Sequence, residues 1–335
     1  MLGLALSVAL LWWALRDVSA AAVVHELRTA HLLPFLGAVV IATATFPLRT
    51  IRWRYLLRYE GAPLPFRPLW HATAIGFMAN NLLPARAGEL ARAYAARRLT
   101  GVRFTTALAS IAVERVFDGL TIVVFMVVAI AAGGFAPNAT VAGMGLTRVA
   151  TIAAIFFGTV FVILLVIVRQ PVRSRALAHR LMSMVLPARL AERGGTIFDG
   201  FIAGLDALQT PGRLAIVVGW SFIIWLVATA SFAVGFAAFG LHPPLSAALM
   251  LQSVIALGVT LPSSPGFFGL FEAATKGTLG LYGIPADPAV SFAIGYHVST
   301  FVPITLLGFW SLWRTKLHLH DLTGGPTPSE QAHAV

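Results

Sequence analysis

Long apolar runs, separated by Arg-rich or Pro-Gly-rich segments, make up most of this chain. Several approach the roughly 20 residues that a helix needs to cross the hydrocarbon core of a membrane. None shows the period-two alternation of a membrane β-barrel. The pattern predicts an all-α, polytopic membrane helical bundle with about six full spans, at about residues 1–16, 32–48, 105–132, 148–168, 214–239 and 288–313.

Two further apolar helices are interrupted by Pro and Gly. The first runs from about residue 69 into NNLLPARAGELARAYAARR, which begins at Asn80, and the second runs from about residue 246 into LPSSPGFFG. Proline removes a backbone donor and biases its neighbour away from helix. Broken backbone at membrane depth is tolerated only where protein or a water-filled cavity surrounds it. We therefore expect two re-entrant broken helices, at 69–103 and 246–284.

The two breaks resemble each other. LPARAG at 83–88 and LPSSPG at 261–266 each close an apolar helix and are each followed by a glutamate. The distribution of basic residues predicts, by the positive-inside rule, that the first break lies on the cytoplasmic side and the second on the external side. Paired breaks in halves of opposite topology are typical of a transporter with its site at the repeat interface. The alternative is that both kinks only help packing.

This repeat divides the chain into three parts. The first membrane repeat covers residues 1–134 and the second covers 135–316, with a cytoplasmic amphipathic segment at 169–213 that we expect to lie against the inner leaflet. The polar tail, 317–335, is expected to be disordered and cytoplasmic. The apolar N-terminus lacks a preceding basic region and is interpreted as a first helix rather than a cleaved signal peptide.

Composition and charge support a membrane protein. Of 335 residues, 58% are hydrophobic and 11% are charged, against roughly 25% charged in a soluble domain. The net charge of +11 comes mainly from Arg beside apolar runs, which indicates cytoplasmic loops and anionic lipid rather than nucleic acid. Arg49, Arg52, Arg54 and Arg58 are interpreted as a basic collar at the cytoplasmic face. The chain should be a multi-pass protein of a bacterial inner membrane, with both termini cytoplasmic.

Three charges fall inside an otherwise apolar span: Glu114, Arg115 and Asp118. Each costs about 2.5 to 3.5 kcal/mol at a helix centre, so they should face the interior of the bundle. Arg115 and Asp118 are three residues apart and can pair. Two interpretations stay open: a structural ion cluster that holds the broken helix through Arg86 or Arg92, or a site for head-group binding or proton coupling.

Further candidates lie at the two breaks. Glu272 and Lys276 have the i, i+4 spacing of a helical salt bridge, and His297 is a lone histidine on an apolar span. The candidate substrate-binding residues are Asn80, Asn81, Arg86, Glu89, Arg92, Arg115, Ser263, Ser264, Glu272 and Lys276. The candidate proton-coupling or ion-pair residues are Glu114, Asp118 and His297. Catalytic, metal and cofactor motifs are missing, and the absence of cysteine excludes disulfides and thiolate chemistry.

Four motifs resemble a known family. RTIRWRYLLR, NNLLPARAGELARAYAARR, ERVFDGL and LPSSPGFFGLFEAA occur in the order and spacing of the transmembrane region of lysylphosphatidylglycerol synthetases, also described as flippase-like or UPF0104-type membrane proteins. The resemblance covers roughly residues 1–316. It implies kinship with the lipid-flipping half of the multiple peptide resistance factor, and with stand-alone proteins of hopanoid, polyprenyl-glycan or archaeal glycosylation pathways.

We therefore expect a lipid transporter or flippase, not an enzyme, that moves an anionic or amphipathic lipid of the phospho- or polyprenyl type between leaflets. The sequence departs from the full-length synthetase in the soluble aminoacyl transferase domain, so we expect transport rather than aminoacylation. The partners expected are membrane lipids, with a homodimer or a lipid-pathway enzyme as further partners. One alternative is a non-transporting accessory subunit of a lipid-linked glycosyltransferase or lipid-modifying pathway; another is an integral membrane transferase.

Overall fold

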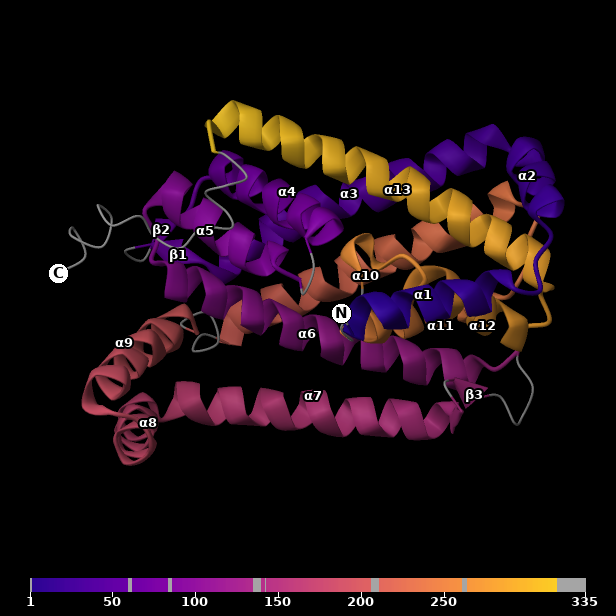
Figure 1. The fold of residues 1–335 in the computed structure, drawn as a ribbon. Coiled ribbons are helices and arrows are strands. Elements are labelled where there is room, and N and C mark those ends of the chain that lie inside the picture. The colour runs from indigo at the N-terminus through magenta and orange to yellow at the C-terminus, as the bar shows by residue number, and fades with distance from the viewer. Residues whose placement is uncertain are drawn as a thin grey trace.

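A computed structural model describes residues 2–59, 62–83, 86–134, 140–141, 143–205, 211–260 and 264–317. Its helices form one elongated bundle (Figure 1). The helices are α1 (Leu2–Leu15), α2 (Ala20–Thr29), α3 (Leu32–Leu56), α4 (Phe66–Leu82), α5 (Gly88–Thr100), α6 (Phe104–Ala132), α7 (Leu146–Arg169), α8 (Pro171–Val185), α9 (Ala188–Gly204), α10 (Pro211–Ala238), α11 (Leu245–Gly258), the 3₁₀ turn η2 (Pro265–Phe267), α12 (Leu270–Leu281) and α13 (Ala286–Thr315). Two antiparallel two-residue ladders join β1 (Arg58–Tyr59) to β2 (Ala62–Pro63) and β3 (Thr140–Val141) to β4 (Met144–Gly145).

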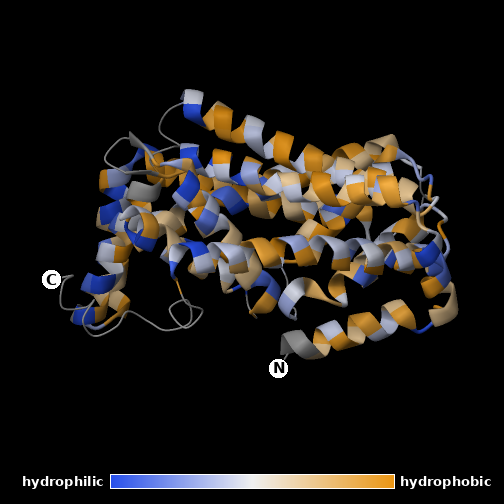
Figure 2. Ribbon diagram, turned by 90° about the horizontal axis from the view of Figure 1, so that it is seen from above, coloured by the Kyte–Doolittle hydropathy of each residue, from blue (hydrophilic) through white to orange (hydrophobic). Residues whose placement is uncertain are grey.

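The prediction of an all-α polytopic membrane protein is confirmed. Within the described residues, five helices are long and apolar enough to cross a membrane: α3, α6, α7, α10 and α13. The pair α1 and α2, bent by 81°, brings the number to six if it forms one span. In the ribbon of Figure 2, hydrophobic residues occur along the whole length of the bundle, and hydrophilic residues are densest at one end.

Two hairpins of shorter helices pack among the long helices of the bundle. α4 packs along α5, and α11 packs along α12. These helices have 17, 13, 14 and 12 residues, and a helix of 17 residues is only about 26 Å long. None of them therefore spans a core of about 30 Å alone. The hairpins lie in opposite halves of the bundle (Figure 1), and the inverted repeat itself stays a prediction.

The first break closes through a very tight helix contact. A Cβ atom on Gly88 would lie 2.0 Å from the carbonyl oxygen of Gly76, so the two glycines let α4 and α5 approach backbone to backbone. Arg86, just after the undescribed residues 84–85, has a left-handed backbone, with φ of 56°. Pro84 lies outside the described residues. Gly88 therefore serves close packing of the two helices.

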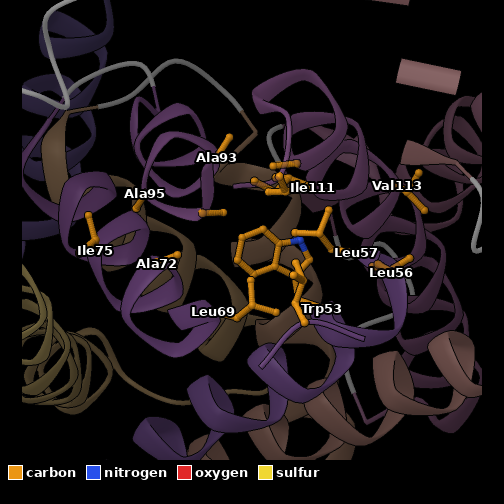
Figure 3. Close-up of a cluster of buried hydrophobic side chains, with 14 of the residues drawn as sticks. Trp53, Leu56, Leu57, Leu69, Ala72, Ile75, Ala93, Ala95, Ile111 and Val113 are labelled. Carbon is orange, nitrogen blue, oxygen red and sulfur yellow. The ribbon is translucent and has the colours of Figure 1, made fainter. Parts of the chain in front are cut away.

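An apolar cluster anchors this end of the bundle around Trp53. Most of its members come from α3, α4, α5 and α6, among them Leu69, Ile75 and Ile111 (Figure 3), and a few come from α7, α10 and α13. The Trp53 indole is fully buried and donates its N–H to the Ser110 hydroxyl at 2.9 Å. The cluster fixes the relative positions of α3, α5 and α6, which carry most of the charged residues described next.

Candidate functional site

Glu114 lies at the centre of a buried ion network. Its side chain, on α6, is fully buried. Its Oε1 atom is 2.9 Å from Arg92 of α5, 3.3 Å from Arg52 of α3 and 2.6 Å from its neighbour Arg115. The Arg92 guanidinium also lies 3.8 Å from the ring centroid of Trp53, a cation–π contact. One carboxylate thus holds α3, α5 and α6 together.

Asp118, one turn further along α6, joins the same network. Its Oδ1 atom accepts hydrogen bonds from Arg52 at 2.6 Å and from the Trp225 indole of α10 at 2.8 Å. Arg115 lies 3.2 Å away, which confirms the i, i+3 pair expected from the sequence, and Arg49 lies 3.7 Å away. Because Trp225 belongs to α10, this carboxylate ties a fourth helix to the network.

The network has a buried inner part and a partly exposed outer part. The side chains of Arg52, Arg92 and Glu114 are at most 4% exposed. Those of Arg86, Glu89 and Arg115 are 28%, 29% and 30% exposed. Arg86 donates to Glu89 at 2.9 Å, and Arg115 lies 3.9 Å from the same carboxylate. A ligand approaching the break would therefore meet Arg86, Glu89 and Arg115 first.

The network carries more positive than negative charge. Its described members are five guanidinium groups and three carboxylates, a formal charge of plus two: Arg49, Arg52, Arg86, Arg92 and Arg115 against Glu89, Glu114 and Asp118. Four of the guanidinium groups also have a buried Nε–H donor without a hydrogen-bond partner among the described residues: Arg52, Arg86, Arg92 and Arg115. The arrangement has spare donors and spare positive charge in the same place.

Arg49 and Arg52 correct the interpretation of a basic collar. The helix does not end near residue 48, because α3 continues to Leu56 and carries both arginines into the core. Arg49 is 8% exposed, Arg52 is fully buried, and both pair with Asp118. Their spacing of three residues on one helix face was the signal in the sequence. The pattern nevertheless favours an interfacial position, because Arg beside an apolar run is normally an interfacial residue.

The two asparagines of the first hairpin bind protein groups. Asn80 Oδ1 accepts from the Gly88 amide at 3.0 Å and so caps the first turn of α5. Asn81 Nδ2 donates to the Thr305 hydroxyl of α13 at 3.0 Å. Both side chains bridge elements that the break would otherwise separate, which keeps the hairpin closed and attached to α13.

The second hairpin has its own polar centre, formed by Glu272 and His297. Glu272 Oε1 is 2.7 Å from His297 Nδ1, while Oε2 accepts from the Gly269 amide at 2.6 Å. His297 Nε2 is 2.9 Å from the Gly266 carbonyl oxygen, so this nitrogen carries a proton. The imidazole stacks on the Phe271 ring at 4.4 Å. The expected Glu272–Lys276 salt bridge is wrong, because Glu272 turns to its own N-cap and to α13.

Lys276 and Ser264 instead hold α1. The Lys276 ammonium donates to the carbonyl oxygens of Trp13 and Ala14 at 3.2 and 3.1 Å, where α1 ends. The Ser264 amide donates to the Ser7 hydroxyl at 2.8 Å. A cation at a helix C-terminus satisfies carbonyls that have no partner within the helix. Ser263 lies outside the described residues.

The structure thus brings the candidate residues together in two groups. Arg86, Glu89, Arg92, Glu114, Arg115 and Asp118 belong to the ion network, and Glu272 and His297 form the second centre. No ion pair between the two groups is present in the described part of the chain. α13 contacts both hairpins, through His297 and through Thr305, and is their physical link. The described residues contain no cluster of three His, Asp or Glu that could hold a metal ion.

Residues 1–308 match the family model of the lysylphosphatidylglycerol synthase TM region. The chain belongs to this family. Similar proteins include the glycosyltransferase AglD of Haloferax volcanii, 29% identical over 281 residues, which cover 77% of this chain and 44% of AglD. Two UPF0104 membrane proteins of Methanothermobacter thermautotrophicus are each 25% identical, over 81% and 78% of this chain and 80% and 77% of their own length. No solved structure matches the chain.

The relatives are consistent with the architecture. The family model covers both hairpins and every residue of the ion network. This chain spans less than half of AglD but most of the two UPF0104 proteins. The part of the chain that matches the family model therefore includes both polar centres.

Proposed function

We propose that this protein moves an anionic lipid between the leaflets of its membrane, with the phosphate of the head group bound at the first hairpin. The observation that carries the proposal is the surplus of two positive charges in the ion network. Uncompensated charge is costly at membrane depth. A phosphate would balance the surplus, and guanidinium groups are suited to it because they donate parallel hydrogen bonds.

Two further features support a ligand at this place. The outer residues Arg86, Glu89 and Arg115 are about 30% exposed, so an entering head group reaches them without unfolding the core. Arg86 also has a left-handed backbone, with φ of 56°, which costs a non-glycine residue on the order of 1 to 3 kcal/mol. Strain of this kind clusters at ligand sites and switch regions.

Acyl-labelled fluorescent phosphatidylglycerol in proteoliposomes tests the proposal, because a label on the tail leaves the head group unchanged. Albumin extraction from the outer leaflet reports how fast inner-leaflet lipid appears outside. We expect Arg86→Gln to slow this movement by roughly 10- to 100-fold. This factor corresponds to the loss of one charge-assisted hydrogen bond to the head group, which contributes about 1.5 to 3 kcal/mol.

The matched control is Arg148→Gln, which makes the same chemical change at an exposed arginine in the first turn of α7. This control should move lipid at the wild-type rate. Equal rates for Arg86→Gln and wild type would refute the site, and no movement of phosphatidylglycerol or of a polyprenyl phosphate by the wild type would refute transport.

The similarity to a protein named a glycosyltransferase favours a second candidate, an accessory subunit of a lipid-linked glycosyltransferase. In that case the network would hold the bundle together and the protein would move no lipid. Purification from native membranes in mild detergent would then recover a glycosyltransferase in stoichiometric amount. A wild-type protein that moves lipid when reconstituted alone would exclude this candidate as its sole role.

A further inference from the structure

α8 is an amphipathic helix whose apolar face is not covered by any part of the chain that the structure describes. It contacts α9 along its length and α7 where it begins, and none of its described residues is buried. Leu177, Leu181, Met184 and Val185 are 58%, 53%, 64% and 80% exposed. At 100° per residue these four side chains fall within an arc of about 100°, the width of the apolar stripe of an amphipathic helix.

The opposite face of α8 is the one that packs on α9. Cβ atoms on Gly194 and Gly195 would lie 2.7 Å from Met182 and 2.3 Å from His179. Arg175 pairs with Asp199 of α9 at 3.2 Å. Since Arg175, His179 and Met182 all face α9, the apolar face points away from it and away from the bundle.

The charge of this region indicates what covers that face. Residues 169–193 contain Arg169, Arg173, Arg175, Arg180, Arg189 and Arg193 and one acidic residue, Glu192. Arg173 and Arg180 are seven residues apart, on the same side of α8, and border the apolar face. A basic, moderately apolar helix with one hydrophobic face is typical of a helix that lies in the interface of an anionic membrane.

The orientation of α8 fits the same partner. α7 runs along the edge of the bundle, and α8 is seen nearly end-on where α7 stops (Figure 1). α7 exposes apolar side chains up to Val166, three residues before it ends. If α7 crosses the membrane, α8 begins where the hydrocarbon ends and lies across the membrane normal, in the plane of the surface.

We propose that α8 docks on the anionic lipid surface next to α7, with Leu177, Leu181, Met184 and Val185 among the acyl chains and with Arg173 and Arg180 on lipid phosphates. This docking is independent of the lipid that the ion network binds. It gives the protein a second lipid contact, selective for charge rather than for one head group.

Because the native chain has no cysteine, single labels can test the docking on the intact protein. Two single-cysteine variants each carry an environment-sensitive NBD dye. The dye at Leu181→Cys lies on the apolar face, and the dye at Ser183→Cys lies at an exposed position near the opposite side of the same helix. In vesicles of phosphatidylcholine with phosphatidylglycerol, lipids that carry a nitroxide on the acyl chain should quench the dye at 181 and not at 183. Quenching at 181 should weaken without phosphatidylglycerol and at high salt.

A double variant isolates the charge contribution. The variant combines Arg173→Gln and Arg180→Gln in the Leu181→Cys background. It should reduce the ratio of membrane-docked to undocked α8 roughly 30-fold, because each arginine near an anionic surface contributes about 1 kcal/mol to binding. Both arginines are exposed, so the fold is not at risk. Equal quenching at 181 and 183 would overturn the proposal. So would shielding of 181 that depends on protein density but not on lipid charge, since a second copy of the chain would then cover the face.

Discussion

Neutralising Glu114 tests the ion network most directly, because its carboxylate contacts three guanidinium groups and is fully buried. Glu114→Gln keeps the shape of the side chain and raises the formal charge of the network from two to three. Each ion pair with charges about 4 Å apart contributes about 4 kcal/mol at an effective dielectric constant of 20. The cost of desolvating the carboxylate, several kcal/mol, offsets part of that gain. We expect a net loss of about 3 to 5 kcal/mol of unfolding free energy, as for other buried pairs broken on one side.

The assay is unfolding by SDS titration in mixed micelles, followed by tryptophan fluorescence. Glu89→Gln is the matched control, because it makes the same chemical change in the same network at a side chain that is 29% exposed. It should cost about 1 kcal/mol or less, as exposed pairs do. Equal losses for the two variants would refute the division into an inner and an outer part. A double-mutant cycle of Glu114→Gln with Arg92→Gln should show a coupling of about 0.5 to 3 kcal/mol, as expected for residues in contact.

Two further predictions concern the hairpins. Gly88→Ala should destabilise the protein by about 1 to 3 kcal/mol, because the new methyl group collides with the Gly76 carbonyl oxygen. The control is Gly158→Ala, which has open space around it and should leave the stability unchanged. Thermal unfolding in detergent compares the two variants, and similar melting temperatures would contradict the close contact. His297→Leu leaves the buried Glu272 carboxylate without its imidazole partner and should lower the unfolding free energy by about 1 to 3 kcal/mol. Adding Glu272→Gln to this variant should recover part of that free energy. If SDS titration shows that the losses of the two single variants simply add, the two side chains do not interact.

The sequence was sufficient to predict an all-α protein with several helices long and apolar enough to cross a membrane. Hydropathy and the length of apolar runs located α3, α6, α7, α10 and α13, because the free energy of inserting a helix depends mainly on its own side chains. Pro and Gly marked both breaks for a similarly local reason, since they change the backbone of their neighbours. The charges of Glu114, Arg115 and Asp118 indicated an interior polar site, because lipid does not tolerate them.

The tertiary structure decided which charges meet. Spacing along one helix predicted the Arg115–Asp118 pair, but it also predicted a Glu272–Lys276 pair, and there Glu272 binds His297 while Lys276 caps α1. Arg52 was the largest omission, and its partners Glu114 and Asp118 are more than 60 residues away. Contacts between helices depend on packing and on how each helix rotates about its axis, and hydropathy determines neither. The sequence therefore determined that charge is buried at the break, and only the fold decided that its balance is positive.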